Sequence, residues 1–156
     1  MIVGITGHSN LDEATAASVR NALREHLAGL DPASLVGVTC LARGADQIFA
    51  DSVLDHGGKL EVIAPAADYF DRIPDPDARA RCDWYLARAT SVRTLPFEHA
   101  GHDAYTAASK ALVDRSELLL AVWDGGTNSG TGEAVAYARS HERRVMVIWP
   151  DGARRT

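Results

Sequence analysis

Glycines, hydroxyl residues and acids gather in residues 124–133, which read Asp-Gly-Gly-Thr-Asn-Ser-Gly-Thr-Gly-Glu. Glycines let a backbone approach a phosphate closely, and the N–H groups at the start of a helix point toward bound anions. A tight turn between a strand and a helix also favours glycine. Four glycines with two threonines favour a ligand site whose backbone is formed by Gly125, Gly126, Gly130, Thr131 and Gly132.

Two carboxylates flank this loop. Asp124 could accept hydrogen bonds from ribose hydroxyls or orient a water molecule, and Glu133 could act as a general base or a ribose ligand. Asp124 is also typical of a turn before a glycine, and Glu133 of a charge that complements the dipole of a helix. The sequence leaves both alternatives open for both residues.

The segment Thr6-Gly7-His8 ends the first apolar run of the chain. Gly7 would allow a close approach to a ligand, while the hydroxyl of Thr6 and the imidazole of His8 would serve as hydrogen-bond partners. A tight turn with helix-capping residues explains the same residues equally well.

A third junction of this kind is Arg43-Gly44-Ala45-Asp46. Arg43 could clamp a phosphate or carboxylate through two parallel hydrogen bonds, and we favour this function for it. For Asp46 we favour a structural role, because a carboxylate in the first turn of a helix is stabilised by the helix dipole. Gly44 completes the candidate ligand loop.

Strand-like and helical patterns alternate along the chain, which predicts an α/β fold. We expect strands at 2–6, 34–41, 59–64, 91–95, 118–123 and 144–149, and helices at 14–30, 47–56, 79–89, 105–116 and 131–142. The apolar, non-alternating strands indicate a mostly parallel sheet of about six strands between two helical layers, a single Rossmann-like αβα domain over residues 1–150. Residues 151–156 are expected to form a frayed tail, and the polar segment 66–81 a surface excursion that could act as a lid.

In such sheets, ligands bind beyond the carboxyl ends of the strands. All three junctions follow strands, so they should meet at the same edge of the sheet. We therefore predict one composite site.

Composition narrows the possible partners. The net charge of −5 over 156 residues argues against a general nucleic-acid binder. No apolar run reaches membrane-spanning length, and no signal peptide is recognisable, so we expect a cytoplasmic protein without a membrane partner.

Cys40 and Cys82 lack metal-ligand spacing, and the two histidines of residues 98–103 are better explained by a solvated loop. We expect no metal and no cofactor; no P-loop or dinucleotide fingerprint occurs.

In combination, the motifs resemble the SLOG superfamily of Rossmann-like domains, which joins the DNA-processing protein A group and the LONELY GUY phosphoribohydrolases. The resemblance spans nearly the whole chain and rests on residues 6–8, 41–46, 113–116, 121–125 and 130–132. It implies a nucleotide or nucleotide-derived ligand held by these loops. It also suggests a homodimer.

The chain departs from the LONELY GUY pattern Pro-Gly-Gly-x-Gly-Thr-x-x-Glu. Three residues separate Gly-Gly from Gly-Thr, Asp124 replaces the proline, and Glu133 lies one position early. The arginine of the Arg-Lys pair is missing from the preceding helix, where Lys110 follows Ser109. These departures favour a sensor or carrier that binds a nucleotide over an enzyme that hydrolyses one.

The alternatives are a nucleoside 5′-monophosphate phosphoribohydrolase or an enzyme similar to nucleoside deoxyribosyltransferases. In either enzyme, Glu133 would assist the reaction at the anomeric carbon and Arg43 would assist catalysis. A protein-interaction or single-stranded-DNA module is a third class. The acidic balance of the chain and the lack of a basic, aromatic-rich stretch disfavour it.

Overall fold

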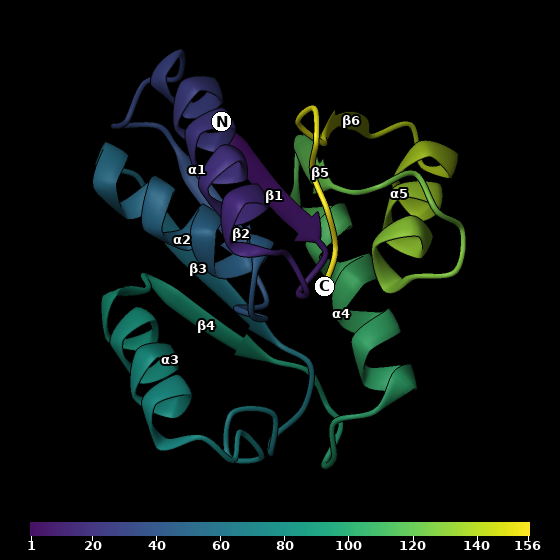
Figure 1. Cartoon of the computed structure of the whole chain (residues 1–156). Helices are drawn as coiled ribbons and strands as arrows, with labels where there is room; N and C mark the ends of the chain where they lie inside the picture. Colours follow the sequence, from purple (N-terminus) through teal and green to yellow (C-terminus); the bar gives the residue numbers. More distant parts are fainter.

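The computed structural model describes residues 1–156 as a sheet of six parallel strands with five helices (Figure 1). The strands are β1 (Ile2–Gly7), β2 (Val36–Thr39), β3 (Lys59–Ala64), β4 (Ser91–Thr94), β5 (Leu118–Val122) and β6 (Arg144–Ile148). The helices are α1 (Glu13–Ala28), α2 (Ala45–His56), α3 (Pro76–Arg88), α4 (His102–Arg115) and α5 (Gly130–Ser140). The expected Rossmann-like α/β architecture is thereby confirmed, with every strand pair parallel.

The strand order β4-β3-β2-β1-β5-β6 reverses direction at β1. Helices α1, α2 and α3 cover one face of the sheet, and α4 and α5 cover the other (Figure 1). The loops that leave β1 and β5 therefore diverge toward opposite faces. Such a switch point opens a crevice at the carboxyl edge of the sheet, where ligands of this fold class bind.

Central strand β5 is buried at every position, as its uninterrupted apolar run predicts. Its side chains alternate between two cores: Leu118 and Leu120 pack with α1 and α2, whereas Leu119 packs with α4. This burial on both faces is characteristic of a parallel sheet covered by helices. The edge strand β4 is exposed throughout, in agreement with its weak pattern.

Local signals explain where the helices begin and end. The Asp12 carboxylate caps α1 by accepting the N–H of Thr15 at 2.8 Å. Gly57 ends α2 in the left-handed region with φ of 90°. Pro76 stands at the start of α3, so the expected excursion 66–81 consists of a loop up to Asp75 and the first turns of a helix. None of the five helices is both long and apolar enough to span a bilayer.

Candidate functional site

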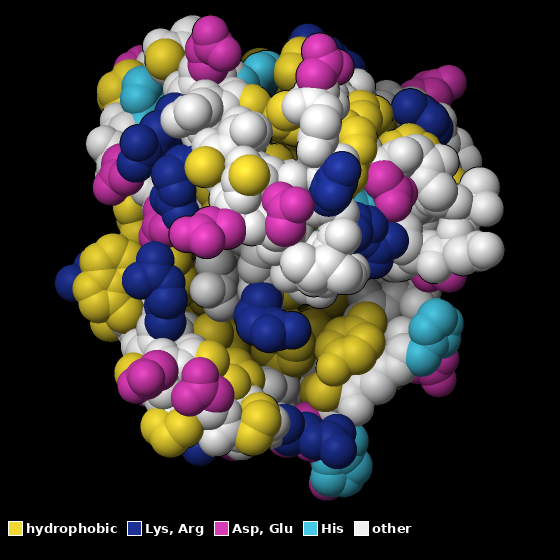
Figure 2. Space-filling view, in the orientation of Figure 1, with side chains coloured by type: hydrophobic (Ala, Val, Ile, Leu, Met, Phe, Trp, Pro, Cys, Tyr) yellow, Lys and Arg dark blue, Asp and Glu magenta, His cyan; other side chains and the backbone are white.

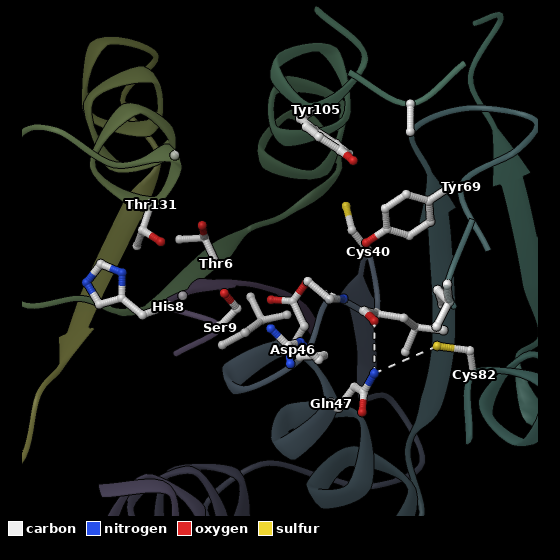
Figure 3. Close-up of a pocket in the computed structure, with 18 of the residues that line it drawn as sticks. Thr6, His8, Ser9, Cys40, Asp46, Gln47, Tyr69, Cys82, Tyr105 and Thr131 are labelled. Atoms are coloured by element: carbon white, nitrogen blue, oxygen red, sulfur yellow. Dashed lines mark hydrogen bonds between the residues drawn. The ribbon is translucent and has the colours of Figure 1, made fainter. Parts of the chain in front are cut away.

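A cavity of about 910 Å³ opens at the carboxyl edge of the sheet. Figure 2 shows a hollow near the middle of this face, bordered by Lys or Arg side chains. Residues from all three predicted junctions line the cavity: Thr6, Gly7, His8, Arg43, Asp46, Gly130 and Thr131. In Figure 3, Thr6, His8 and Thr131 lie on one side of the cavity, with Tyr69 and Tyr105 on the other. The structure thus brings the three junctions together.

His8 joins the loops that follow β1 and β5. It is only 3% exposed, and its Nε2 atom accepts the backbone N–H of Asp124 at 3.1 Å. Its ring meets that of Trp149 edge-on, with centroids 5.7 Å apart. Burial and then the neighbouring Arg155 charge lower the pKa of His8, against the opposing influence of Asp124. The imidazole is therefore neutral, which leaves Nε2 as an acceptor.

Asp124 is not among the residues that line the cavity. Its Oδ1 accepts the N–H of Gly126 at 2.9 Å, forming the turn that the sequence allowed as an alternative. That hydrogen bond is the main cause that lowers the pKa of Asp124, so the carboxylate is ionised. The backbone N–H of Asp124 donates to Nε2 of His8 at 3.1 Å, and Oδ2 lies 3.5 Å from Nη1 of Arg155. These contacts make Asp124 an organiser of the loops.

The junction between β2 and α2 needs a glycine. Gly44 has φ of 78°, and a Cβ atom there would lie 2.6 Å from the His8 carbonyl oxygen. The close approach lets Ala45 donate its N–H to that oxygen at 3.3 Å. Gly44 therefore allows the loop after β2 to pack closely against the loop after β1. The side chain of Arg43 is exposed, and Arg43 lines the cavity.

Asp46 is a buried carboxyl group in the cavity wall, 7% exposed. Its Oδ2 atom accepts the N–H of Ala42 at 3.2 Å. Burial raises the pKa of Asp46 to about 7, although the Ala42 hydrogen bond opposes the shift. The group can therefore gain or lose a proton near neutral pH.

The start of α5 offers backbone donors to the cavity. Ser129 caps the helix by accepting the N–H of Gly132 at 3.1 Å through its hydroxyl. No hydrogen bond within the chain uses the N–H groups of Gly130 and Thr131, and both residues line the cavity. These N–H groups, at the positive end of a helix, are suited to bind an anion.

The remaining glycines shape this loop without lining the cavity. Gly125 adopts φ of 89°, which favours glycine. Gly126 accepts the indole N–H of Trp123 at 2.8 Å through its carbonyl oxygen. A Cβ atom on Gly132 would approach that same oxygen to 2.7 Å. The glycines thus allow close folding of the loop, and only Gly130 offers its backbone to the cavity.

Glu133 faces a second cavity of about 410 Å³ between the starts of α4 and α5. Successive helical residues rotate by about 100°, so Glu133 points away from the side of α5 that carries Thr131. Lys110 and Tyr137 line this second cavity as well. The two cavities share four lining residues, which are Tyr105, Ser109, Ser129 and Gly130.

The segment before α3 forms one side of the main cavity. Tyr69 and Arg72 line it, and the ring of Tyr69 meets that of Tyr105 on α4 with centroids 6.2 Å apart. Asp68 fastens the segment by accepting the N–H of Ala100 at 2.7 Å. The sequence pointed to a lid here but did not single out these side chains.

Arg155 also lines the main cavity, although nothing in the local sequence pattern indicated it. Residues 151–156, which were expected to fray, are hydrogen-bonded to the loop after β1, including a bond from Asn10 Nδ2 to the Thr156 carbonyl oxygen at 2.9 Å.

No group of three or more His, Cys, Asp or Glu side chains is arranged to hold a metal ion. Cys40 and Cys82 are unpaired thiols.

No protein-family model matches the sequence, and no curated protein matches it significantly. Solved structures do match its fold. DNA processing protein A from Streptococcus pneumoniae is 20% identical with a TM-score of 0.72, over 96% of this chain and 50% of that protein. The corresponding protein from Helicobacter pylori, described for its single-stranded-DNA binding mode, is 16% identical with a TM-score of 0.69, over 94% and 64%.

A molybdenum-cofactor-binding protein from Rippkaea orientalis is 16% identical with a TM-score of 0.63, over 96% of this chain and 77% of that protein. This chain spans about half of the S. pneumoniae protein and just under two thirds of the H. pylori protein. At these identities the matches show the fold. They agree with the Rossmann-like α/β fold that the sequence predicts.

Proposed function

We propose that this chain, which has the fold of the SLOG superfamily, binds a nucleotide or a nucleotide-derived ligand as a sensor or carrier. The observation that carries the proposal is the main cavity at the switch point of the sheet. It combines the unbonded N–H groups of Gly130 and Thr131 with the side chains of Arg43 and Arg72. Backbone donors at a helix start and arginine side chains are the usual partners of phosphate.

The other parts of a nucleotide have suitable partners in the same cavity. Tyr69 and Tyr105 offer aromatic faces on which a base could stack. Asp46 would accept from ribose hydroxyls in place of Asp124, because Asp46 lines the cavity and Asp124 does not. A volume of about 910 Å³ lies within the range of small-molecule sites. The R. orientalis protein, which binds molybdenum cofactor, supports ligand binding by this fold.

Calorimetric titration with AMP, ADP, ATP, GMP, GDP and GTP tests the proposal. We expect at least one to bind, and we expect Arg43→Ala to weaken it roughly tenfold or more, because a charge-assisted contact to phosphate is lost. Arg24→Ala is the matched control, since Arg24 pairs with Asp55 on the surface at 3.4 Å. The proposal fails if none of the six nucleotides binds at millimolar concentration.

Hydrolysis of the N-glycosidic bond is the second candidate, and the second cavity favours it. Glu133 and Lys110 line that cavity, which adjoins the main one at Gly130. A phosphate held at Gly130 would place the rest of a nucleotide within reach of either cavity. Incubation with AMP discriminates: release of adenine by the unmodified protein, abolished in Glu133→Gln, would replace the binding-only function with an enzymatic one.

Single-stranded DNA, which the H. pylori protein binds, is not our proposal for this chain. The net charge of −5 would repel a polyanion, whereas a local cluster of arginines suffices for a small phosphate ligand. Salt-sensitive binding of oligonucleotides in a mobility-shift assay would reverse this choice. A homodimer and a cytoplasmic location remain predictions from the sequence.

A further inference from the structure

Residues 154–156 fold back onto the loop that follows β1. Arg155 forms an antiparallel bridge with Leu11, and Asp12 donates its N–H to the Arg154 carbonyl oxygen at 3.3 Å. Figure 1 shows the yellow end of the chain running from β6 to the end of β1. The segment therefore reaches the switch point, where it places a side chain in the wall of the main cavity.

That side chain is Arg155, and it is only partly engaged. Its Nε–H donates to Asn10 Oδ1 at 2.9 Å, which fixes the plane of the guanidinium group. Its Nη1 atom lies 3.5 Å from Asp124 Oδ2, longer than an ordinary N–H···O hydrogen bond. A guanidinium has five N–H donors, and only the one on Nε makes a hydrogen bond within the chain. The donors on the two Nη atoms are left for another partner.

Asp124 is a replaceable partner for this guanidinium. The carboxylate already accepts the N–H of Gly126 at 2.9 Å, so it keeps this partner if Arg155 turns away. The side chains of Arg155 and Asp124 are 37% and 30% exposed, so water can reach the pair and weakens their attraction. A phosphate offers more charge and two oxygens to the same fork of donors.

We infer that Arg155 is a ligand-contact residue, which binds an anionic oxygen group in the main cavity by exchanging the Asp124 carboxylate for it. The inference rests on the proposed function, in which the group is the phosphate of a bound nucleotide. It makes the C-terminal segment part of the binding site. A ligand without an anionic group at this position cannot make the contact with Arg155. Arg155 therefore raises the affinity for phosphorylated ligands over unphosphorylated ones.

The test is calorimetry with the same six nucleotides on Arg155→Gln, which keeps a polar side chain but removes the charge. Arg154→Ala is the matched control, because Arg154 lies on the same segment but does not line the cavity. We expect Arg155→Gln to weaken nucleotide binding roughly ten- to hundredfold. We expect Arg154→Ala to change the affinity less than threefold, roughly the effect of a surface substitution.

Unchanged affinity in Arg155→Gln overturns the inference, as does an equal loss in Arg154→Ala. Hydrogen exchange of the Asp12 amide, which donates to Arg154, reports whether the segment stays in place. If that amide exchanges faster in Arg155→Gln, the variant Arg155→Lys, which keeps the charge, is measured as well. Affinity that is partly recovered in Arg155→Lys supports the inference, and affinity as low as that of Arg155→Gln overturns it. A complete lack of binding by the unmodified protein overturns the proposed function instead.

Discussion

The Nε2 atom of His8 accepts the backbone N–H of Asp124 at 3.1 Å, a hydrogen bond between residues 116 positions apart in the chain. It joins the ends of the two strands that flank the switch point, because His8 follows β1 and Asp124 lies just after β5. The bond holds the two diverging loops at a fixed separation. A neutral imidazole is required, since the protonated ring has no acceptor.

We expect His8→Ala to lower the free energy of unfolding by about 1–3 kcal/mol at pH 8, because the Asp124 N–H loses its acceptor. The pKa of His8 is lowered, mainly by burial, so the unfolded chain takes up this proton first as the pH falls. The unmodified protein therefore loses this stabilisation below pH 6.5. Urea unfolding at pH 8 and pH 5.5 should show the gap between the two proteins narrowing at the lower pH.

His102→Ala is the control for this experiment, because His102 is exposed and its removal should change stability little at either pH. A gap between the unmodified protein and His8→Ala that widens on acidification would contradict a neutral His8. That result would indicate an ion pair with Asp124.

Asp46→Asn should stabilise the protein without ligand at pH 8. Burial raises the pKa of Asp46 to about 7, so ionisation above that pH destabilises the folded state. The folded chain binds more protons than the unfolded chain between pH 4 and 7, so stability falls as the pH rises through this window. The amide oxygen of asparagine can still accept the Ala42 N–H. We expect a gain on the order of 1–4 kcal/mol at pH 8 that disappears near pH 4.

Thermal melts of both proteins from pH 4 to pH 8 measure this effect. Asp55→Asn is a suitable comparison, since Asp55 is on the same helix with a side chain that is 65% exposed. Equal melting temperatures for Asp46→Asn and the unmodified protein at pH 8 would show that the Asp46 carboxylate is well solvated, contrary to its position in the cavity wall.

Gly132→Ala should distort the loop before α5, because the new Cβ would lie 2.7 Å from the Gly126 carbonyl oxygen. We expect a loss of about 1–3 kcal/mol in unfolding free energy, together with weaker nucleotide binding. Gly130→Ala is the matched control, since a Cβ there meets nothing within 4 Å. Chemical unfolding of both variants tests the difference; similar losses would mean that the close contact at Gly132 is relieved at little cost.

The fold was predictable because its signals are local. Apolar runs mark the buried strands, and caps such as Asp12 and Gly57 mark helix ends. The convergence of three junctions followed from the parallel sheet alone. The direction of Glu133 was not predictable in this way, because the exact start of α5 decides which side chains turn toward the main cavity. Arg155 was missed for another reason: its place depends on the bridge to Leu11, a contact across the whole chain that leaves no local pattern.

We expect a nucleotide phosphate to bind at the start of α5, and amide chemical shifts measure this binding directly. A ¹H–¹⁵N spectrum recorded during titration with the tightest-binding of the six nucleotides should show its largest changes at the N–H groups of Gly130 and Thr131. These two donors have no partner within the chain and line the main cavity. Saturating changes that leave both amides unmoved, or no changes at millimolar nucleotide, would contradict the claim.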